Sequence, residues 1–215
     1  MMNNVIRVWD PLVRIFHWSL VLAFAVAYLS GDEENSLHIY SGYIVAGLII
    51  FRLVWGIVGT RYARFSHFIY SPGAVATYMK DLLAGRPQHH VGHNPAAGWM
   101  IVVLLVTLAV ITVSGLKVYA IEEGLGPLAD GAHSISIISQ AFADSDDDDG
   151  HERHEKPHHD DDEEEFWEEI HEASSNFMLL LIALHVAGVI VSGRLHRENL
   201  VKAMITGNKT DIPGA

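Results

Sequence analysis

The sequence contains no cysteine among its 215 residues. Without thiols the chain can form no disulfide, no iron–sulfur cluster, no thiolate zinc site and no covalent c-type haem attachment. Cations are also scarce, because 14 Lys and Arg stand against 26 Asp and Glu, which gives a formal net charge of −12. Cofactors held through cysteine are therefore excluded, and the 14 histidines are left as the unusual feature of the composition.

Charge and apolar residues are segregated along the chain. Half of the residues are hydrophobic and the mean hydropathy is +0.21, which is unusual for a water-soluble protein with this net charge. Much of the acid lies in one segment, residues 144–165, with the sequence DSDDDDGHERHEKPHHDDDEEE. This segment lacks a continuous apolar run and repels itself, so we expect a disordered loop there.

Four other segments are long and apolar enough to cross a bilayer, which takes about 20 residues. They span residues 12–30, 37–59, 96–117 and 166–193. Because backbone groups in lipid must be paired within their own segment, we expect all four to be helices. The sequence therefore predicts an all-α membrane protein with a single domain over residues 1–215, folded as a bundle of four transmembrane helices.

Basic residues predict the orientation of this bundle. They lie before the first helix, between the second and third, and after the fourth, at Arg7, Arg14, Arg61, Arg64, Lys80, Arg86, Arg194, Arg197, Lys202 and Lys209. These three regions share one side of the membrane, which we expect to be cytoplasmic. Both termini would then lie inside the cell, and the acidic loop would lie outside.

Two histidines of the fourth apolar segment, His171 and His185, are 14 residues apart. On a helix this separation turns through about 1,400°, close to four full circles, and rises about 21 Å. The two side chains therefore share one face at opposite depths of the bilayer. Polar groups inside a membrane helix are costly and are usually functional.

Each of these histidines has a candidate partner at matched depth on another helix. His17 lies near the cytoplasmic end of the first helix and matches His185, whereas His38 lies at the outer start of the second helix and matches His171. Two neutral imidazoles that face each other across a bundle can ligate a haem iron from both sides. The sequence thus predicts two b-type haems enclosed by the four helices. The alternative, that these are packing or proton-relay histidines, would make both depth matches coincidences.

Other residues are candidates for contact with these haems. Gly42 follows His38 by one turn and leaves room for a flat macrocycle, although small residues also serve helix packing. Met178 lies midway between His171 and His185, so we expect it between the two haems. Haem propionates need cations at the membrane edge, and the candidates are Arg14, Arg52 and Lys117. For Arg14, a role as a positive-inside anchor is equally consistent with the sequence.

The chain resembles the bacterial cytochrome b561 family, including the related b-type cytochrome subunits of membrane hydrogenases. The resemblance rests on VRIFHWSL in the first helix, LHIYSGYIVAGLIIFRLVWGIVG followed by TRYARF in the second, and the pair His171 and His185 in the fourth. It covers nearly the whole chain except the acidic loop. It implies a four-helix bundle in the bacterial inner membrane, which would make the acidic loop periplasmic, and it implies two haems b. The family's axial ligands fall on His17, His38, His171 and His185.

The same resemblance implies electron transfer between a quinone pool, ubiquinone or menaquinone, and a redox partner. The chain would then be an electron-transfer cytochrome, either a quinone oxidoreductase or the cytochrome subunit of one. A quinone site should lie at one end of the bundle. Candidate groups are Tyr62 and Arg64 on the inner side, or Tyr40, Tyr43 and Tyr119 on the outer side.

The histidines of the inner loops, such as His67, His90 and His93, are expected to be solvated.

The acidic loop admits three interpretations. It is a solvated linker, or it attracts a basic periplasmic partner such as a c-type cytochrome, or it binds metal weakly through His151, His154, His158 and His159. The last interpretation supports a rival function, a metal-ion transporter or sensor. Such a pathway would need carboxylates in the apolar centres of the helices, and these have none. Expected partners are membrane lipid, quinone and a redox protein, and no nucleic acid; the oligomeric state stays open, with a homodimer as one option.

Overall fold

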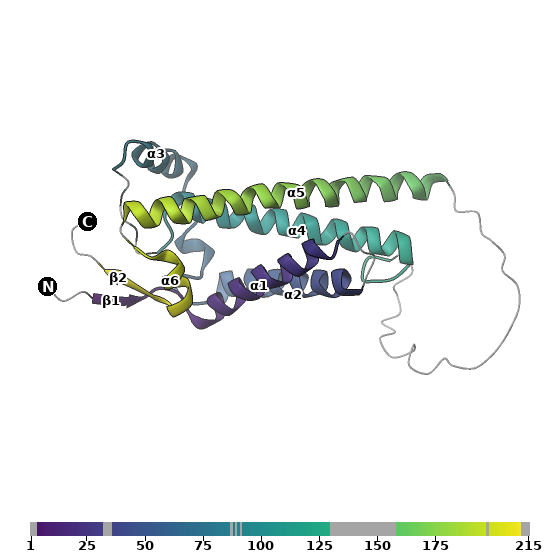
Figure 1. The fold of residues 1–215 in the computed structure, drawn as a ribbon, viewed down its shortest axis with the longest axis horizontal. Helices are drawn as coiled ribbons and strands as arrows, with labels where there is room; N and C mark the ends of the chain where they lie inside the picture. Colours follow the sequence, from purple (N-terminus) through teal and green to yellow (C-terminus); the bar gives the residue numbers. More distant parts are fainter. Residues whose placement is uncertain are drawn as a thin grey trace, which may run out of the picture. The chain divides into compact units, whose positions relative to one another are not determined.

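The computed structural model describes residues 4–31, 36–86, 88, 90, 92–129, 158–196 and 198–211. Its four long helices are α1 (Pro11–Leu29), α2 (Ser36–Val58), α4 (Pro95–Glu123) and α5 (His158–Leu195), and all four are drawn in Figure 1. Each contains a stretch long and apolar enough to cross a membrane. The predicted all-α fold with four membrane-spanning helices is therefore confirmed.

The remaining elements are short. They are β1 (Asn4–Arg7), the 3₁₀ helix η1 (Phe65–His67), α3 (Pro72–Leu83), α6 (Leu200–Thr206) and β2 (Asn208–Asp211). In the described part of the chain, strands occur only as the pair β1 and β2. The helices thus carry the architecture, and the strands join the two ends of the chain.

Two helix boundaries differ from the prediction. α4 runs on to Glu123, past the predicted end at residue 117. α5 begins at His158 rather than at residue 166, so residues 158–165 of the acidic segment are helical and not disordered. Acidic side chains are favourable in the first turns of a helix because they face the positive end of its dipole, and glutamate is a good helix former. Residues 144–157 of that segment lie outside the described residues.

The chain divides into two compact units. The first unit comprises Met1–Thr112 and Ser174–Ala215, and the second comprises Val113–Ala173. The core of the first unit takes residues from all four long helices, namely Ala23, Val45, Ile49, Leu108, Met178 and Leu181. Within this unit the four helices therefore share one apolar core, as a bundle requires.

Most of the apolar surface of the long helices faces outwards. In the apolar stretch of each long helix, only 11–28% of the residues are buried. Large aliphatic side chains such as Leu22 and Ile57 are 66% and 72% exposed. Water would oppose so large a continuous apolar surface, whereas the hydrocarbon of a bilayer matches it. The exposure is therefore that of helices surrounded by lipid.

Asp10 fixes the start of α1 and connects it to the end of α2. Its carboxylate accepts a hydrogen bond from the backbone N–H of Val13 at 2.9 Å, which caps the helix ahead of Pro11 at its first position. The same side chain accepts from Trp55 Nε1 at 3.2 Å and from the Thr60 hydroxyl. Burial alone would raise the pKa of Asp10, but these hydrogen bonds outweigh it and hold the pKa below its ordinary value.

The two ends of the chain are bound to each other. β1 pairs antiparallel with β2, with Asn4 opposite Asp211 and Arg7 opposite Asn208 (Figure 1). Gly207 ends α6 in a left-handed conformation with φ of 86°, and a Cβ there would lie 2.7 Å from the Trp9 carbonyl oxygen. Glycine is therefore required at this turn for β2 to return along β1.

Candidate functional site

His17 on α1 and His185 on α5 both lie in the first unit. Both side chains are partly buried. The two imidazoles lie close enough for their charges to repel each other if both are protonated. The two imidazoles therefore lie within range of each other's charge, and their pairing around one haem stays a prediction.

His17 is not held as a packing histidine usually is. Its Nδ1 atom is buried and has no hydrogen-bond partner among the described residues. Its ring contacts Trp18 edge-on, with centroids 5.1 Å apart. Buried polar atoms are normally paired, so an unpaired one in the bundle argues against a purely structural role and fits a ring available to a cofactor.

His38 lies in the first turns of α2. Its Nδ1 atom is 2.9 Å from the backbone carbonyl oxygen of Ala27 on α1. A carbonyl can only accept, so Nδ1 carries the proton and the ring's lone pair is on Nε2, the tautomer that a metal ligand needs. At Gly42, one turn later, no atom lies within 4 Å of the place that a Cβ would occupy. This space beside the helix fits a flat macrocycle.

His171 lies on α5 in the second unit. Its Nδ1 atom is 3.2 Å from the hydroxyl oxygen of Ser114 on α4. The His171 ring packs against the backbone at the neighbouring Gly115, where a Cβ would lie only 2.8 Å from His171 Cε1. Since His38 belongs to the first unit, the pairing of His38 with His171 stays a prediction.

Arg52 is a buried cation in the last third of α2. Its side chain is 4% exposed, and its Nη1 atom has no hydrogen-bond partner among the described residues. The guanidinium carbon lies 4.9 Å from the centre of the Phe65 ring and 5.7 Å from that of Phe68. A buried charge without a bonded counter-ion is costly. The arrangement fits an anionic group of a bound cofactor, such as a haem propionate.

The other candidate haem contacts are placed as follows. The Arg14 guanidinium donates a hydrogen bond to the Ile205 carbonyl of α6. Lys117 is partly buried. It lies within α4 and not at its end, because that helix continues to Glu123. Met178 is 1% exposed and belongs to the bundle core. Their contacts with haem stay predictions.

A cavity of about 290 Å³ lies in the first unit, at the loops that surround η1 and the start of α4. It combines aromatic rings with imidazole, phenol and guanidinium groups and has no carboxylate in its lining. The lining residues are Arg61, Tyr62, His67, Phe68, Tyr70, His90, Gly92 and His93. Tyr62, one of the inner candidates for quinone contact, is among them, whereas Arg64 is not.

The expectation that the loop histidines are solvated is wrong for His93. Its ring packs against Trp9 and Phe68, with centroids 4.5 and 4.8 Å away. Burial, together with the positive charge of Arg52, lowers the pKa of His93 to about 3. His93 precedes Asn94, which caps α4 by accepting from the Ala97 N–H at 2.8 Å. Its ring contacts Trp9 and Phe68, which are distant in sequence, so no local pattern predicts this burial.

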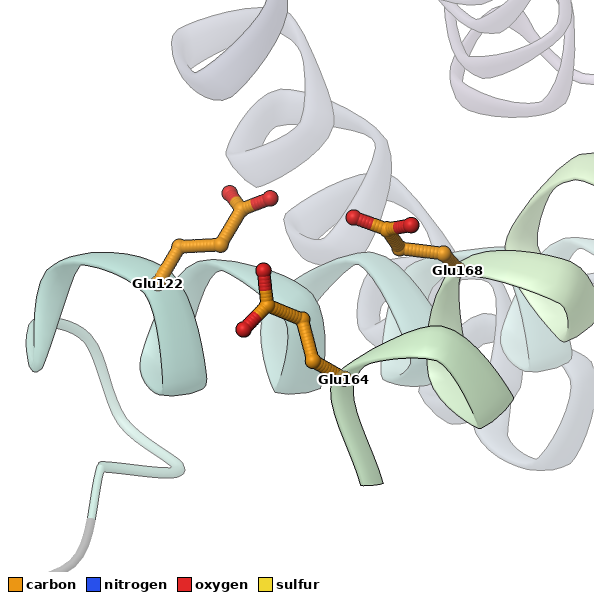
Figure 2. A group of neighbouring side chains, drawn as sticks. All are labelled: Glu122, Glu164 and Glu168. Carbon is orange, nitrogen blue, oxygen red and sulfur yellow. The ribbon is translucent and has the colours of Figure 1, made fainter. Parts of the chain in front are cut away.

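Three carboxylates of the second unit lie close together. Figure 2 shows Glu122 of α4 with Glu164 and Glu168 of α5, and one carboxylate oxygen of each lies within 4.8 Å of the others. Exposed acidic groups of this kind are common without an ion, so the cluster alone is no metal site. Of the predicted metal-binding histidines, His151 and His154 lie outside the described residues.

Comparison with known proteins identifies the relatives of this chain. A probable Ni/Fe-hydrogenase 1 B-type cytochrome subunit of Escherichia coli K12 is 31% identical in an alignment of 130 positions that covers 44% of this chain and 53% of that protein. A probable Ni/Fe-hydrogenase B-type cytochrome subunit of Rhodobacter capsulatus is 21% identical in an alignment of 238 positions that covers 95% of this chain and 81% of that protein. The chain thus spans about half the length of the Escherichia coli subunit it matches.

No solved structure matches the chain. The family model for prokaryotic cytochrome b561 matches residues 8–207, a range that includes all four long helices and His17, His38, His171 and His185. The chain therefore belongs to the prokaryotic cytochrome b561 family.

Proposed function

We propose that this chain is a membrane cytochrome that carries electrons across the bilayer through two b-type haems. His17 and His185 would hold one haem, and His38 and His171 would hold the other. The observation that carries the proposal is the buried Nδ1 of His17, which has no hydrogen-bond partner among the described residues, on a ring within range of the charge of His185. Membership of the cytochrome b561 family supports the choice of haem as the cofactor.

When bound, b-type haem supplies one-electron chemistry between its ferric and ferrous states. The chain's own residues hold and insulate it. Two histidine ligands for each haem would leave no position for oxygen, and the apolar core around Met178 and Leu181 would keep water away from it. Arg52 would neutralise a propionate at the end of the bundle where α2 meets η1.

We propose quinone as the membrane substrate and the cavity around His93 as its site. The cavity offers aromatic walls for a quinone ring, with Tyr62 and His90 as hydrogen-bond groups for its carbonyl oxygens. It lies on the side of the positively charged loops, which we place in the cytoplasm of a bacterium, with the chain in the inner membrane. The second partner would be a redox protein such as a hydrogenase, because the relatives are named as hydrogenase cytochrome subunits.

The first test is a visible spectrum of the purified protein in detergent, oxidised and then reduced with dithionite, with haem quantified per chain. We expect sharp reduced α and Soret bands and about two haems b per chain. His17→Ala and His38→Ala should each remove one haem, and the double variant should remove both. His67→Gln is the matched control, since His67 is exposed and should leave the haem content unchanged.

The quinone site has a separate readout. Tyr62→Phe and His90→Gln should slow oxidation of the reduced protein by a soluble quinone while the haem content stays at the wild-type value. Equal rates in wild type and variants would exclude this cavity as the site but would leave the haem proposal intact. A colourless protein from haem-replete cells would overturn the cytochrome proposal itself and favour metal binding.

A further inference from the structure

We propose that Ser114 is a positioning residue for His171, and that its hydroxyl tunes the redox potential of the haem that His171 would hold. The inference rests on the proposed function, because it takes His171 as an iron ligand. It concerns two residues of the second unit, Ser114 on α4 and His171 on α5. Neither the family nor the relatives' names assign a role to Ser114.

The contact with Ser114, together with the usual bonding of a serine within a helix, indicates which nitrogen of His171 carries the proton. Ser114 is fully buried, with 0% exposure, and its Oγ lies 3.2 Å from Nδ1 of His171. A neutral imidazole has one N–H and one lone pair, and the partner of one nitrogen decides the state of the other. A serine hydroxyl within a helix usually donates its hydrogen to a carbonyl of the preceding turn. Its oxygen is then left to accept from Nδ1–H, and the lone pair is on Nε2, the nitrogen that would bind iron.

Gly115 fixes the position of the same ring. A Cβ on Gly115 would lie 2.8 Å from Cε1 and 3.1 Å from Nδ1 of His171, closer than side chains tolerate. The imidazole therefore rests against the backbone of α4 at Gly115, while the Ser114 hydroxyl fixes its rotation. Two consecutive residues of α4 thus determine where the ring lies and how it is oriented.

Two of the other candidate ligands, His38 and His17, differ in this respect. His38 directs Nδ1 to the backbone carbonyl of Ala27, an acceptor that no substitution removes. Nδ1 of His17 has no hydrogen-bond partner among the described residues. Ser114 is therefore a side-chain acceptor that a single substitution can delete while the ligand itself stays.

A hydrogen bond accepted from Nδ1–H makes the imidazole a stronger donor to the metal. A stronger donor favours ferric over ferrous iron, so the bond lowers the midpoint potential of the haem. Removing the Ser114 hydroxyl should raise that potential and let the ring rotate. Because second-shell partners of metal-bound histidines commonly change site properties by a factor of ten or more, the shift should be measurable.

The test is a redox titration of the purified, haem-loaded protein, together with EPR spectra of its ferric state. In Ser114→Ala we expect the ratio of reduced to oxidised haem at fixed potential to rise about tenfold for one haem, which equals about 59 mV for a one-electron couple. The other haem should titrate as in wild type, and one set of EPR g-values should move. Ser114→Thr keeps the hydroxyl and should restore both properties.

Thr107→Val is the matched control. Thr107 is another buried hydroxyl residue of α4, 7% exposed, and it forms no hydrogen bond to a candidate ligand among the described residues. This variant should leave both potentials unchanged. If Ser114→Ala titrates like wild type with unchanged g-values, the inference is overturned while the proposed function stands. Loss of one haem in Ser114→Ala that Ser114→Thr restores supports the inference, whereas loss in both variants shows a steric role and overturns it. If His171→Ala keeps both haems, the proposed ligand set is wrong.

Discussion

His93 is a titratable side chain enclosed by aromatic rings, and its protonation should govern how stability depends on pH. In the folded protein burial lowers its pKa to about 3, and Arg52, Lys209 and His185 oppose its protonation further. In the unfolded chain its pKa is about 6.5. As the pH falls below about 6.5, His93 becomes protonated in the unfolded chain but stays neutral in the folded protein. The free energy of unfolding should therefore decrease as the pH falls from 6.5 towards 3.

This dependence can be measured as the change in Tm of the detergent-solubilised protein between pH 7.5 and pH 5. We expect the decrease in Tm between pH 7.5 and pH 5 to be smaller for His93→Gln than for wild type, whatever the Tm of the variant at pH 7.5. His67→Gln removes an exposed imidazole instead and should keep the wild-type slope. A His93→Gln slope equal to that of wild type would show that the pKa of His93 is not depressed.

At the scale of single elements, α4 must present a bare backbone to His171. Gly115→Ala would bring a Cβ to 2.8 Å from the ring, and the imidazole could not keep its place. We expect this variant to lose one of the two proposed haems, read from the absorbance per chain. Gly73→Ala on α3 is the control, because no atom lies within 4 Å of its added Cβ and α3 carries no candidate haem ligand. It should keep both haems and gain helix propensity, by about 1 kcal/mol at most. Full haem content in Gly115→Ala would contradict the close approach.

The start of α1 depends on one carboxylate. Asp10→Ala removes the helix cap and the acceptor for Trp55 and Thr60, so we expect a loss of about 1–2 kcal/mol. For a chain of this size that corresponds to a Tm lower by about 2–8 °C. Asp10→Asn keeps an oxygen acceptor and should recover most of the loss. Equal Tm values for Asp10→Ala and wild type would show that the cap contributes nothing.

At the scale of the whole molecule, the absence of cysteine permits a direct test of orientation. Single cysteines at Thr206 and Glu123 mark the end of α6 and the end of α4, and the natural chain adds no background thiol. In intact spheroplasts a membrane-impermeant maleimide should label Glu123→Cys at once and Thr206→Cys only after lysis. Early labelling of Thr206→Cys would reverse the orientation that the basic loops predict.

Much of the architecture was predictable because membrane helices carry their signal locally. A long apolar run must form a helix in lipid whatever its neighbours do, so the four spans were predicted to within a few residues, apart from the extensions of α4 and α5. The start of α5 also has a local cause. The acidic residues before Phe166 repel one another, which predicts a loop, but they are also favourable at a helix N-terminus, and the helix begins there.

Residue type and helical period alone are enough to predict four spanning helices, to predict histidines at two depths and to exclude cysteine-held cofactors. Which atoms are in contact follows only from the folded chain. The tertiary structure placed Ser114 and Gly115 against His171, packed His93 between Trp9 and Phe68, and joined β1 to β2 across nearly the whole chain. Such contacts join residues distant in sequence, and their geometry follows from how the helices pack, which no local pattern records.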